Sequence, residues 1–392
     1  MPTYINPGVY IEELPNSSRN IIGVTTSIAA FIGRARIGPL CEPVPINSYS
    51  DFERTFGGLW TSSPMTFAVN DYFKNGGKEA LIVRVGSGQA EDDTVEIIET
   101  PIINNKDVEM VLDALNRVDL FNILCIPPLY ENIDINQNLI SAAAMYCEKR
   151  RAILILDCPR TWVTSQDAIC GMKNSTYSLG TDSKNAAVYF PRIQMPNPLR
   201  NNKIETFAAC GAIAGVFART DLEHGVWKAP AGVNAILNGV TDLLVAVTNE
   251  KNDELNKLGC NCLRVFPSTG PVVWGARTLQ GSEWKYLPVR RLALFIEESL
   301  YRGTQWAVFE PNDEPLWAQI RLNIGAFLHN LFKSGAFQGS IPREAYFVKC
   351  DTETTTQDDI NKGIFNIFVG FAPIRPAEFV ILKLSQHAAQ TE

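Results

Sequence analysis

Phe121-Asn-Ile-Leu-Cys-Ile126 and Ala152-Ile-Leu-Ile-Leu156 are two short apolar runs, and residues 139–149 between them have helical character. Short apolar runs of this kind are typical of buried strands, and a helix between two of them predicts a βαβ unit. Asn185-Ala-Ala-Val-Tyr-Phe190 is a third such run. The middle of the chain therefore predicts an α/β domain.

The flanking regions continue the mixture of strands and helices. On the N-terminal side, a helix is expected over residues 64–73, because Asn75-Gly-Gly77 follows it as a stop. On the C-terminal side, Pro288 lies in the first turn of an expected helix that runs to about Tyr301, and residues 316–333 predict a second helix with one apolar face. Other strands are expected at residues 28–32, 80–85, 263–266, 271–274, 305–309, 344–349 and 364–371.

Composition excludes several classes of partner. The 392 residues are 46% hydrophobic, which is enough for a sizeable core in two or three domains. The formal net charge is −7, and only 20% of the residues are charged. No basic face is evident, so we expect neither nucleic acid nor an anionic membrane as a partner.

Cysteine usage and hydropathy indicate the compartment. Nine cysteines, an odd number, are scattered along the chain, which is typical of reduced and buried thiols and predicts folding in a cytoplasm. The first fifteen residues lack a basic region followed by an apolar core, so no secretory signal is expected. The longest apolar stretch, residues 207–218, is shorter than the roughly 20 residues of a membrane span, so no direct membrane insertion is expected.

Two groups of carboxylates are the strongest candidates for catalysis. Asp157 closes the run that ends at Leu156, where α/β enzymes often carry a carboxylate, but it is equally a turn residue before Cys158-Pro159. Glu297 and Glu298 are adjacent on an expected helix, so their side chains point about 100° apart. A structural ion pair with Arg290, Arg291 or Arg302 explains them better than acid–base chemistry.

The remaining motifs are incomplete. Gly86-Ser-Gly88 follows a strand but lacks the third glycine and the lysine of a phosphate-binding loop. Cys260 and Cys262 would share one face of a strand, yet no second Cys/His pair lies at zinc-site spacing, so core packing is expected. The histidines, His224, His329 and His387, fit no nucleophile or metal motif. We therefore predict no catalytic, cofactor-binding or metal site and no cofactor.

Both ends of the chain carry short strands that lack a nearby partner. One lies within Pro7-Gly-Val-Tyr-Ile-Glu-Glu-Leu-Pro15, and the other, Glu378-Phe-Val-Ile-Leu-Lys-Leu384, follows a linker with two prolines. An exposed strand of this kind pairs readily with another chain, which predicts a subunit that binds its neighbours by strand addition. The predicted inter-subunit residues are Val9, Tyr10, Ile11, Glu12, Glu13, Phe379, Val380, Ile381, Leu382, Lys383 and Leu384.

Five segments closely resemble the contractile tail sheath family, which includes the sheaths of contractile phages, R-type pyocins and extracellular contractile injection systems. The resemblance covers residues 1–85 and about 225–385 strongly, and the middle in general pattern. The compact length is more similar to the injection-system and pyocin type. The segments are Pro7-Gly-Val-Tyr-Ile-Glu-Glu13, Gly225-Val-Trp-Lys-Ala-Pro-Ala-Gly232, Val273-Trp-Gly-Ala-Arg-Thr-Leu279, Phe309-Glu-Pro-Asn-Asp-Glu-Pro-Leu-Trp317 and Ala372-Pro-Ile-Arg-Pro-Ala-Glu-Phe-Val380.

The resemblance implies a two-domain α/β subunit with an inner domain built from both termini and extended strand arms. Its expected parts are an N-terminal arm and part of the inner domain at residues 1–24, an outer α/β domain at 25–259, an inner sheath domain at 260–376 and a C-terminal arm at 377–392.

The resemblance also implies the function and the partners. The subunit would polymerise helically around an inner tube protein and contract to drive the tube through a target envelope. Further implied partners are baseplate and terminal cap proteins, and the resemblance allows for paralogous sheath chains. Such particles assemble in the cytoplasm, and release outside the cell stays open. A helix faces the tube in this family, and residues 316–333 are the candidate, with Arg321, His329 and Lys333 as tube-facing side chains.

One alternative comes from a different class of protein. An oligomeric cytosolic α/β enzyme would use the same terminal strands only to hold an oligomer of fixed size. Long hollow cylinders would favour the sheath, and a small closed oligomer would favour the enzyme.

Overall fold

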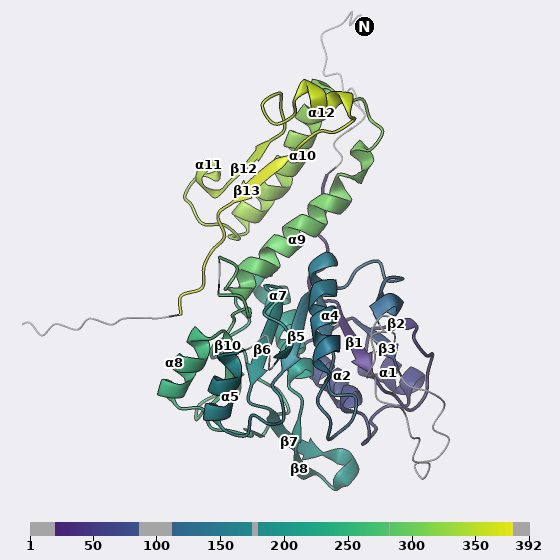
Figure 1. Ribbon diagram of the computed structural model, residues 1–392, viewed down its shortest axis with the longest axis vertical. Coiled ribbons are helices and arrows are strands. Elements are labelled where there is room, and N and C mark those ends of the chain that lie inside the picture. Colours follow the sequence, from purple (N-terminus) through teal and green to yellow (C-terminus); the bar gives the residue numbers. More distant parts are fainter. Residues whose placement is uncertain (1–19, 86–111, 175–178, 282, 379–392) are drawn as a thin grey trace, which may run out of the picture. The chain divides into compact units, whose positions relative to one another are not determined.

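The computed structural model describes residues 20–85, 112–174, 179–281 and 283–378 (Figure 1). The predicted inter-subunit residues, 9–13 and 379–384, lie outside these ranges, and of the predicted C-terminal arm, residues 377–392, the structure describes Ala377 and Glu378. The described residues divide into two compact units. One unit contains residues 24–298 and 373–378, and the other contains residues 20–23 and 299–372.

The larger unit is built on one eight-stranded sheet, whose middle strands are parallel. The strands lie in the order β11 (Gly270–Val273), β10 (Cys260–Phe266), β6 (Ala186–Phe190), β5 (Ile153–Asp157), β4 (Ile123–Cys125), β1 (Ala29–Gly33), β3 (Ala80–Arg84) and β2 (Pro43–Ile46). The two outermost strands, β2 and β11, are antiparallel to their neighbours. The chain thus forms the parallel sheet that its apolar runs predicted.

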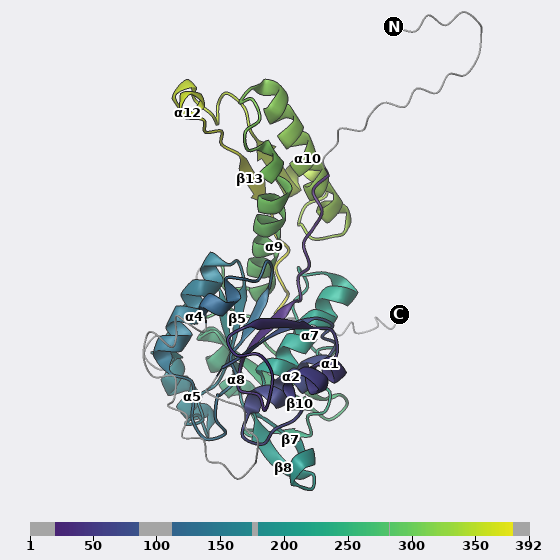
Figure 2. The same cartoon turned by 90° about the vertical axis from the view of Figure 1, so that its right-hand side faces the viewer.

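Helices cover both faces of this sheet (Figure 2). Alternate strand residues point to opposite faces, so Phe31 joins one core cluster and Ile32 joins the other. The first face packs against α1 (Tyr49–Phe56), α2 (Pro64–Lys74), α7 (Cys210–His224) and the start of α9 (Leu287–Gly303). The second face packs against α4 (Gln137–Lys149), α5 (Ser165–Met172) and α8 (Asn249–Lys257). This doubly wound arrangement confirms the predicted α/β class.

The larger unit also contains a small second sheet of three strands. It contains β8 (Lys203–Phe207), β7 (Ile193–Asn197) and β9 (Asp242–Leu243), all antiparallel, with the short 3₁₀ helix η1 (Pro198–Arg200) between β7 and β8.

The smaller unit combines one long helix with a two-stranded sheet. Its elements after the end of α9 are η2 (Gln305–Ala307), α10 (Glu314–Lys333), α11 (Pro342–Ala345), β12 (Tyr346–Lys349), α12 (Gln357–Asn361) and β13 (Phe368–Phe371). The N-cap of helix α10 is Asp313, whose side chain accepts a hydrogen bond from the Leu316 amide, and the helix buries one apolar stripe as predicted.

Two expectations differ from the structure. Residues 305–309 are not a strand, because residues 305–307 form the 3₁₀ helix η2 and Phe309 has a positive φ of 71°. The expected domain boundary at residues 259/260 also differs. Strand β10 pairs in parallel with β6 inside the large sheet, so the division falls within α9, between Glu298 and Ser299.

Candidate functional site

The two-stranded sheet of the smaller unit is the first candidate for assembly. Strands β12 and β13 pair antiparallel, with Tyr346 opposite Phe371 and Val348 opposite Val369. The Tyr346 ring lies 6.2 Å from the Phe337 ring, and its hydroxyl lies 3.1 Å from Nδ1 of His329 on α10. One face of the sheet is therefore packed within the subunit.

The other face of this sheet is exposed, and neither outer edge pairs with a further strand in the part of the chain that the structure describes. Phe347 and Phe368 point to the outer face and are 55% and 56% exposed. The Phe347 ring covers Gly370 on the opposite strand so closely that a Cβ on Gly370 would lie 2.2 Å from the ring. Each strand is paired along one side only, which leaves two rows of backbone groups for further strands.

The three predicted tube-facing side chains have different surroundings. Lys333 is exposed at the end of α10. Arg321 binds the Glu314 carboxylate at 2.5 Å and the Cys350 carbonyl, and His329 is directed to Tyr346. Two of the three therefore have contacts within the subunit, and Lys333 keeps its amine on the surface.

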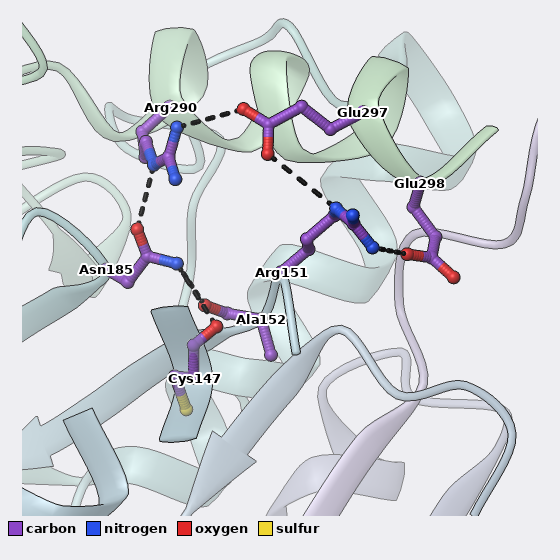
Figure 3. Close-up of polar contacts among 7 residues, drawn as sticks. All are labelled: Cys147, Arg151, Ala152, Asn185, Arg290, Glu297 and Glu298. Carbon is purple, nitrogen blue, oxygen red and sulfur yellow. Dashed lines mark hydrogen bonds and ion pairs between the residues drawn. The ribbon is translucent and has the colours of Figure 1, made fainter. Parts of the chain in front are cut away.

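A polar cluster holds the beginning of α9 on the larger unit (Figure 3). Arg151 lies between the two glutamates of α9, 2.9 Å from Glu298 and 3.9 Å from Glu297. Arg290 binds Glu297 at 3.3 Å and donates a 2.8 Å hydrogen bond to Asn185. The predicted structural ion pair of Glu297 with Arg290 is confirmed, and no acid–base pair is needed to explain either glutamate.

Asn185 extends this cluster into the sheet. Its side-chain amide is fully buried and donates to the carbonyls of Ala152 at 2.9 Å and Cys147 at 3.3 Å. The sequence did not indicate Arg151 or Asn185, because each lies more than 100 residues from its partner on α9.

A second ion pair fixes α9 against α7. Arg291 donates to both carboxylate oxygens of Asp221, at 2.7 and 2.6 Å, and both side chains are 3% exposed. Arg291 also donates to the Thr26 carbonyl at 3.0 Å. Such a forked, fully hydrogen-bonded pair offsets the cost of removing its charges from water.

Asp157, the carboxylate weighed for catalysis, holds the start of a helix. Its Oδ1 atom accepts hydrogen bonds from the amides of Ala209 at 2.6 Å and Cys210 at 2.9 Å. Helix α7 has no side-chain cap at its own N-cap residue, Ala209, so Asp157 supplies that cap from β5. Burial raises the pKa of Asp157, while the charge of Arg192 and the hydrogen bonds oppose that rise.

The other residues that the sequence offered as candidates are the cysteine pair, the glycine motif and the histidines. Cys260 and Cys262 are buried on the same face of β10, as predicted, and burial raises the pKa of Cys262 to about 12. Gly86-Ser-Gly88 and His387 lie outside the described residues. His224 is half exposed and lies 4.0 Å from Glu223. Among the residues that the structure describes, no three His, Cys, Asp or Glu side chains group as metal ligands.

None of the described helices has the length and apolar character to cross a bilayer.

Family models match most of the chain. The phage tail sheath protein central domain matches residues 103–279, and the phage tail sheath C-terminal domain matches residues 280–386. A putative prophage major tail sheath protein of Pseudomonas aeruginosa strain UCBPP-PA14 is 26% identical over 348 residues, which cover 86% of this chain and 83% of that relative. The tail sheath protein of Enterobacteria phage T4 is 27% identical over 176 residues, which cover 44% of this chain but only 26% of the phage protein.

Solved structures share the whole fold. The sheath complex of an extracellular contractile injection system, PVC, in its contracted state matches with a TM-score of 0.78 and 28% identity over 100% of both chains. The contracted helical sheath of the anti-feeding prophage matches with a TM-score of 0.74 and 31% identity over 97% of this chain and 99% of that one.

The class of protein is therefore a structural subunit of a phage-tail-like particle. In particular, the chain belongs to the phage tail sheath family, and its role is that of a contractile sheath subunit. The resemblance found in the sequence is confirmed.

Proposed function

We propose that the chain polymerises helically around an inner tube protein and that contraction of the sheath drives the tube through a target envelope. The family assignment supports this role, as do the matches to contracted sheath complexes. The work would come from a change between two packings of the same subunits. The chain would then need no catalytic site and no cofactor.

The two-stranded sheet is the observation that carries the assembly mechanism. A sheet of two strands is marginal in water, and β12 and β13 each have one unpaired edge within the described residues. Two edges offer places for two further strands, and the chain has two terminal arms, around residues 9–13 and 379–384. We propose that the arms of neighbouring copies complete each sheet by strand addition.

The exposed aromatic side chains favour the same arrangement. Phe347 and Phe368 leave more than half of their surface in water on the outer face of the sheet. Strands added to either edge would extend this face and place apolar arm residues beside these rings. Backbone hydrogen bonds would hold the neighbours together while the subunits rotate.

The remaining partners follow from the family. One match is the anti-feeding prophage baseplate, with 31% identity and a TM-score of 0.75, and we propose that this chain also meets a baseplate protein, a terminal cap and, in some particles, paralogous sheath chains. Assembly would take place in the cytoplasm, with the finished particle released from the cell.

The tube contact is proposed for one side chain of α10. Lys333 is exposed, and its ammonium would attract acidic residues of the tube. Arg321 and His329, which contact other residues of the subunit, would act by holding α10 and β12 in place.

Removal of residues 379–392 from the full chain tests the strand-exchange mechanism. We expect the full chain to form hollow striated cylinders in negative-stain electron microscopy, and we expect the truncated chain to stay monomeric with an unchanged circular dichroism spectrum. Cylinders from the truncated chain would exclude exchange of this arm. A small closed oligomer from the full chain would favour the oligomeric enzyme instead.

A further inference from the structure

Arg277 has a backbone that is fixed on the larger unit. Its amide donates a 2.7 Å hydrogen bond to the side-chain oxygen of Asn261, and the side-chain nitrogen of Asn261 donates back to the Arg277 carbonyl at 2.8 Å. Asn261 itself is fully buried in β10 and also donates to the Val188 carbonyl of β6 at 3.1 Å. Arg277 is thereby held against the sheet by a side chain that cannot reach water.

The guanidinium of Arg277 forms a site for one carboxylate. Its Nε atom donates to Oε1 of Glu378 at 2.9 Å, and a second nitrogen, Nη2, donates to Oε2 of the same carboxylate. The remaining nitrogen, Nη1, donates to the Asn256 carbonyl at 2.7 Å. The side chains of Arg277 and Glu378 are only 13% and 18% exposed, so water screens this forked pair weakly.

Glu378 occupies a particular place in the chain. Six residues earlier, Ala372 still belongs to the smaller unit, where its amide donates to the Ala345 carbonyl and its carbonyl accepts from the Gln338 amide, both at 2.8 Å. Residues 373–377 follow, with Pro373 and Pro376 among them. Glu378 lies at the start of the predicted C-terminal arm, residues 377–392, and directly before the predicted inter-subunit residues 379–384.

Two of the segments that resemble the sheath family meet at this contact. Arg277 lies in the segment 273–279, and Glu378 lies in the segment 372–380, 101 residues away in the sequence. The ion pair cannot be predicted from either segment alone, because a single charged residue in a segment gives no sign of a partner so far away in the sequence.

We propose that Arg277 is a positioning residue for strand exchange: it holds Glu378 on the larger unit, so that the last 14 residues leave from a fixed point. This proposal rests on the proposed function. Because the predicted exchanging strand, residues 379–384, follows Glu378 directly, the position of Glu378 sets where that strand can meet an acceptor sheet.

Loss of the contact between Arg277 and Glu378, called the clamp below, would add residues 373–378 to the free length of the arm. The arm would then be 20 residues long, counted from Ala372, and would lose its fixed direction. The exchanging strand itself begins at residue 379, so the release inserts a flexible linker, residues 373–378, between the last anchored residue and that strand, and this lowers the effective concentration of the strand at the acceptor edge. Loss of direction adds to that decrease, and assembly should slow.

The test measures two quantities separately: the mobility of the chain next to Glu378 and the rate of cylinder formation. A nitroxide spin label is placed at position 377 of the full chain, as Ala377→Cys with the two solvent-accessible cysteines, Cys41 and Cys170, replaced by serine. Spectra are recorded below the concentration at which sedimentation detects polymers, and cylinder formation is followed by light scattering above it. The variants are Arg277→Gln, Glu378→Gln and the double variant, and the control is Arg375→Gln, which removes an exposed charge from the same linker.

We expect restricted label motion in the parent chain and in Arg375→Gln, and fast motion in the other three variants. Because the two side chains act as a pair, the label in the double variant should move no faster than in either single variant. Assembly of the three should be slower than that of the parent chain and of Arg375→Gln. Equal label motion in all chains would show that no clamp exists, and a released label with unchanged assembly would overturn the positioning role. Failure of the parent chain to polymerise would instead count against the proposed function.

Discussion

The Oδ1 atom of Asp157 lies 2.9 Å from the backbone nitrogen of Cys210, the first residue of helix α7. A carboxylate at the end of a parallel strand here stabilises a helix that begins 53 residues later. The interaction joins two elements that pack against each other at the centre of the larger unit.

Replacement of Asp157 by alanine should destabilise the larger unit by about 2–3 kcal/mol. The substitution removes a helix cap and leaves the amides of Ala209 and Cys210 unpaired. Asp157→Asn keeps an oxygen acceptor and should lose less than half as much. Urea unfolding followed by circular dichroism measures both, and equal losses in the two variants would contradict the capping role.

The two glutamates of α9 should differ sharply in their contribution to stability. Glu298 is 11% exposed and lies 2.9 Å from Arg151, whereas Glu297 is 45% exposed. Glu298→Gln should cost about 1–3 kcal/mol, because it weakens a pair that is largely removed from water. Glu297→Gln serves as the neighbouring control and should change the unfolding free energy by less than about 1 kcal/mol. The reverse order in a thermal or urea denaturation would show that burial does not govern this cluster.

Asp71 should make the larger unit less stable as the pH rises. Its side chain is 2% exposed, its Oδ2 atom has no hydrogen-bond partner in the described part of the chain, and burial raises its pKa to about 7, which Lys74 opposes. Between the unfolded pKa of about 4 and the folded value, only the folded chain keeps this proton. The free energy of unfolding therefore falls by about 1.4 kcal/mol per pH unit in that window and changes little above it.

Asp71→Asn removes this titration without a change of shape. We expect the variant to match the parent chain near pH 4 and to exceed it in stability at pH 8. Urea unfolding at pH 5, 6, 7 and 8 measures the difference, which should grow up to about pH 7 and then level off. A difference that stays constant would mean that Asp71 does not keep its proton in the folded chain.

Gly370 and Phe347 should be coupled across the two-stranded sheet. A Cβ at position 370 would lie 2.2 Å from the Phe347 ring, so Gly370→Ala displaces that ring, and because the ring is more than half exposed and can move, the cost should be at most about 1 kcal/mol. Phe347→Ala makes room for the methyl group, and the double variant should lose less than the sum of the two single losses. Simple additivity in a double-mutant cycle would argue against the close packing of the ring on the glycine.

A charge in the C-terminal arm should block assembly and leave the monomer folded. Phe379→Asp places a carboxylate in a strand that is predicted to be buried on both faces after exchange. We expect no cylinders in negative-stain images and an unchanged circular dichroism spectrum. Gln386→Asp, beyond the predicted strand, serves as the control and should assemble. Normal cylinders from Phe379→Asp would show that this side chain is not buried between subunits.

Local sequence patterns predicted the large sheet well. The segments that form β4, β5 and β6 are short and apolar, which is typical of strands that are covered on both faces of a sheet. The residues that end α2 are likewise next to it in the sequence. Helix α10 was equally clear, because its apolar stripe and its Asp313 cap lie within one stretch of chain. Patterns of this kind depend on neighbouring residues alone.

The differences came from interactions across long distances. Residues 305–309 contain Trp, Val and Phe, which favour strands, yet they begin with the 3₁₀ helix η2. The predicted boundary at residues 259/260 differs from the division of the described residues into two compact units, because β10 pairs in parallel with β6 about 70 residues upstream. For the same reason, the sequence left the role of Asp157 open and gave no sign of the Arg277–Glu378 contact.

The edges of the two-stranded sheet have a consequence for handling the protein. The outer edge of β12 ends in Lys349, a charge that opposes unwanted pairing, but β13 reads Phe-Val-Gly-Phe and carries no charge at all. A purified subunit therefore presents one edge with a charged residue, at β12, and one edge without a charge, at β13. Storage at high concentration should favour irregular aggregates that start at β13, and a short peptide that pairs with β13 should keep the stock dispersed.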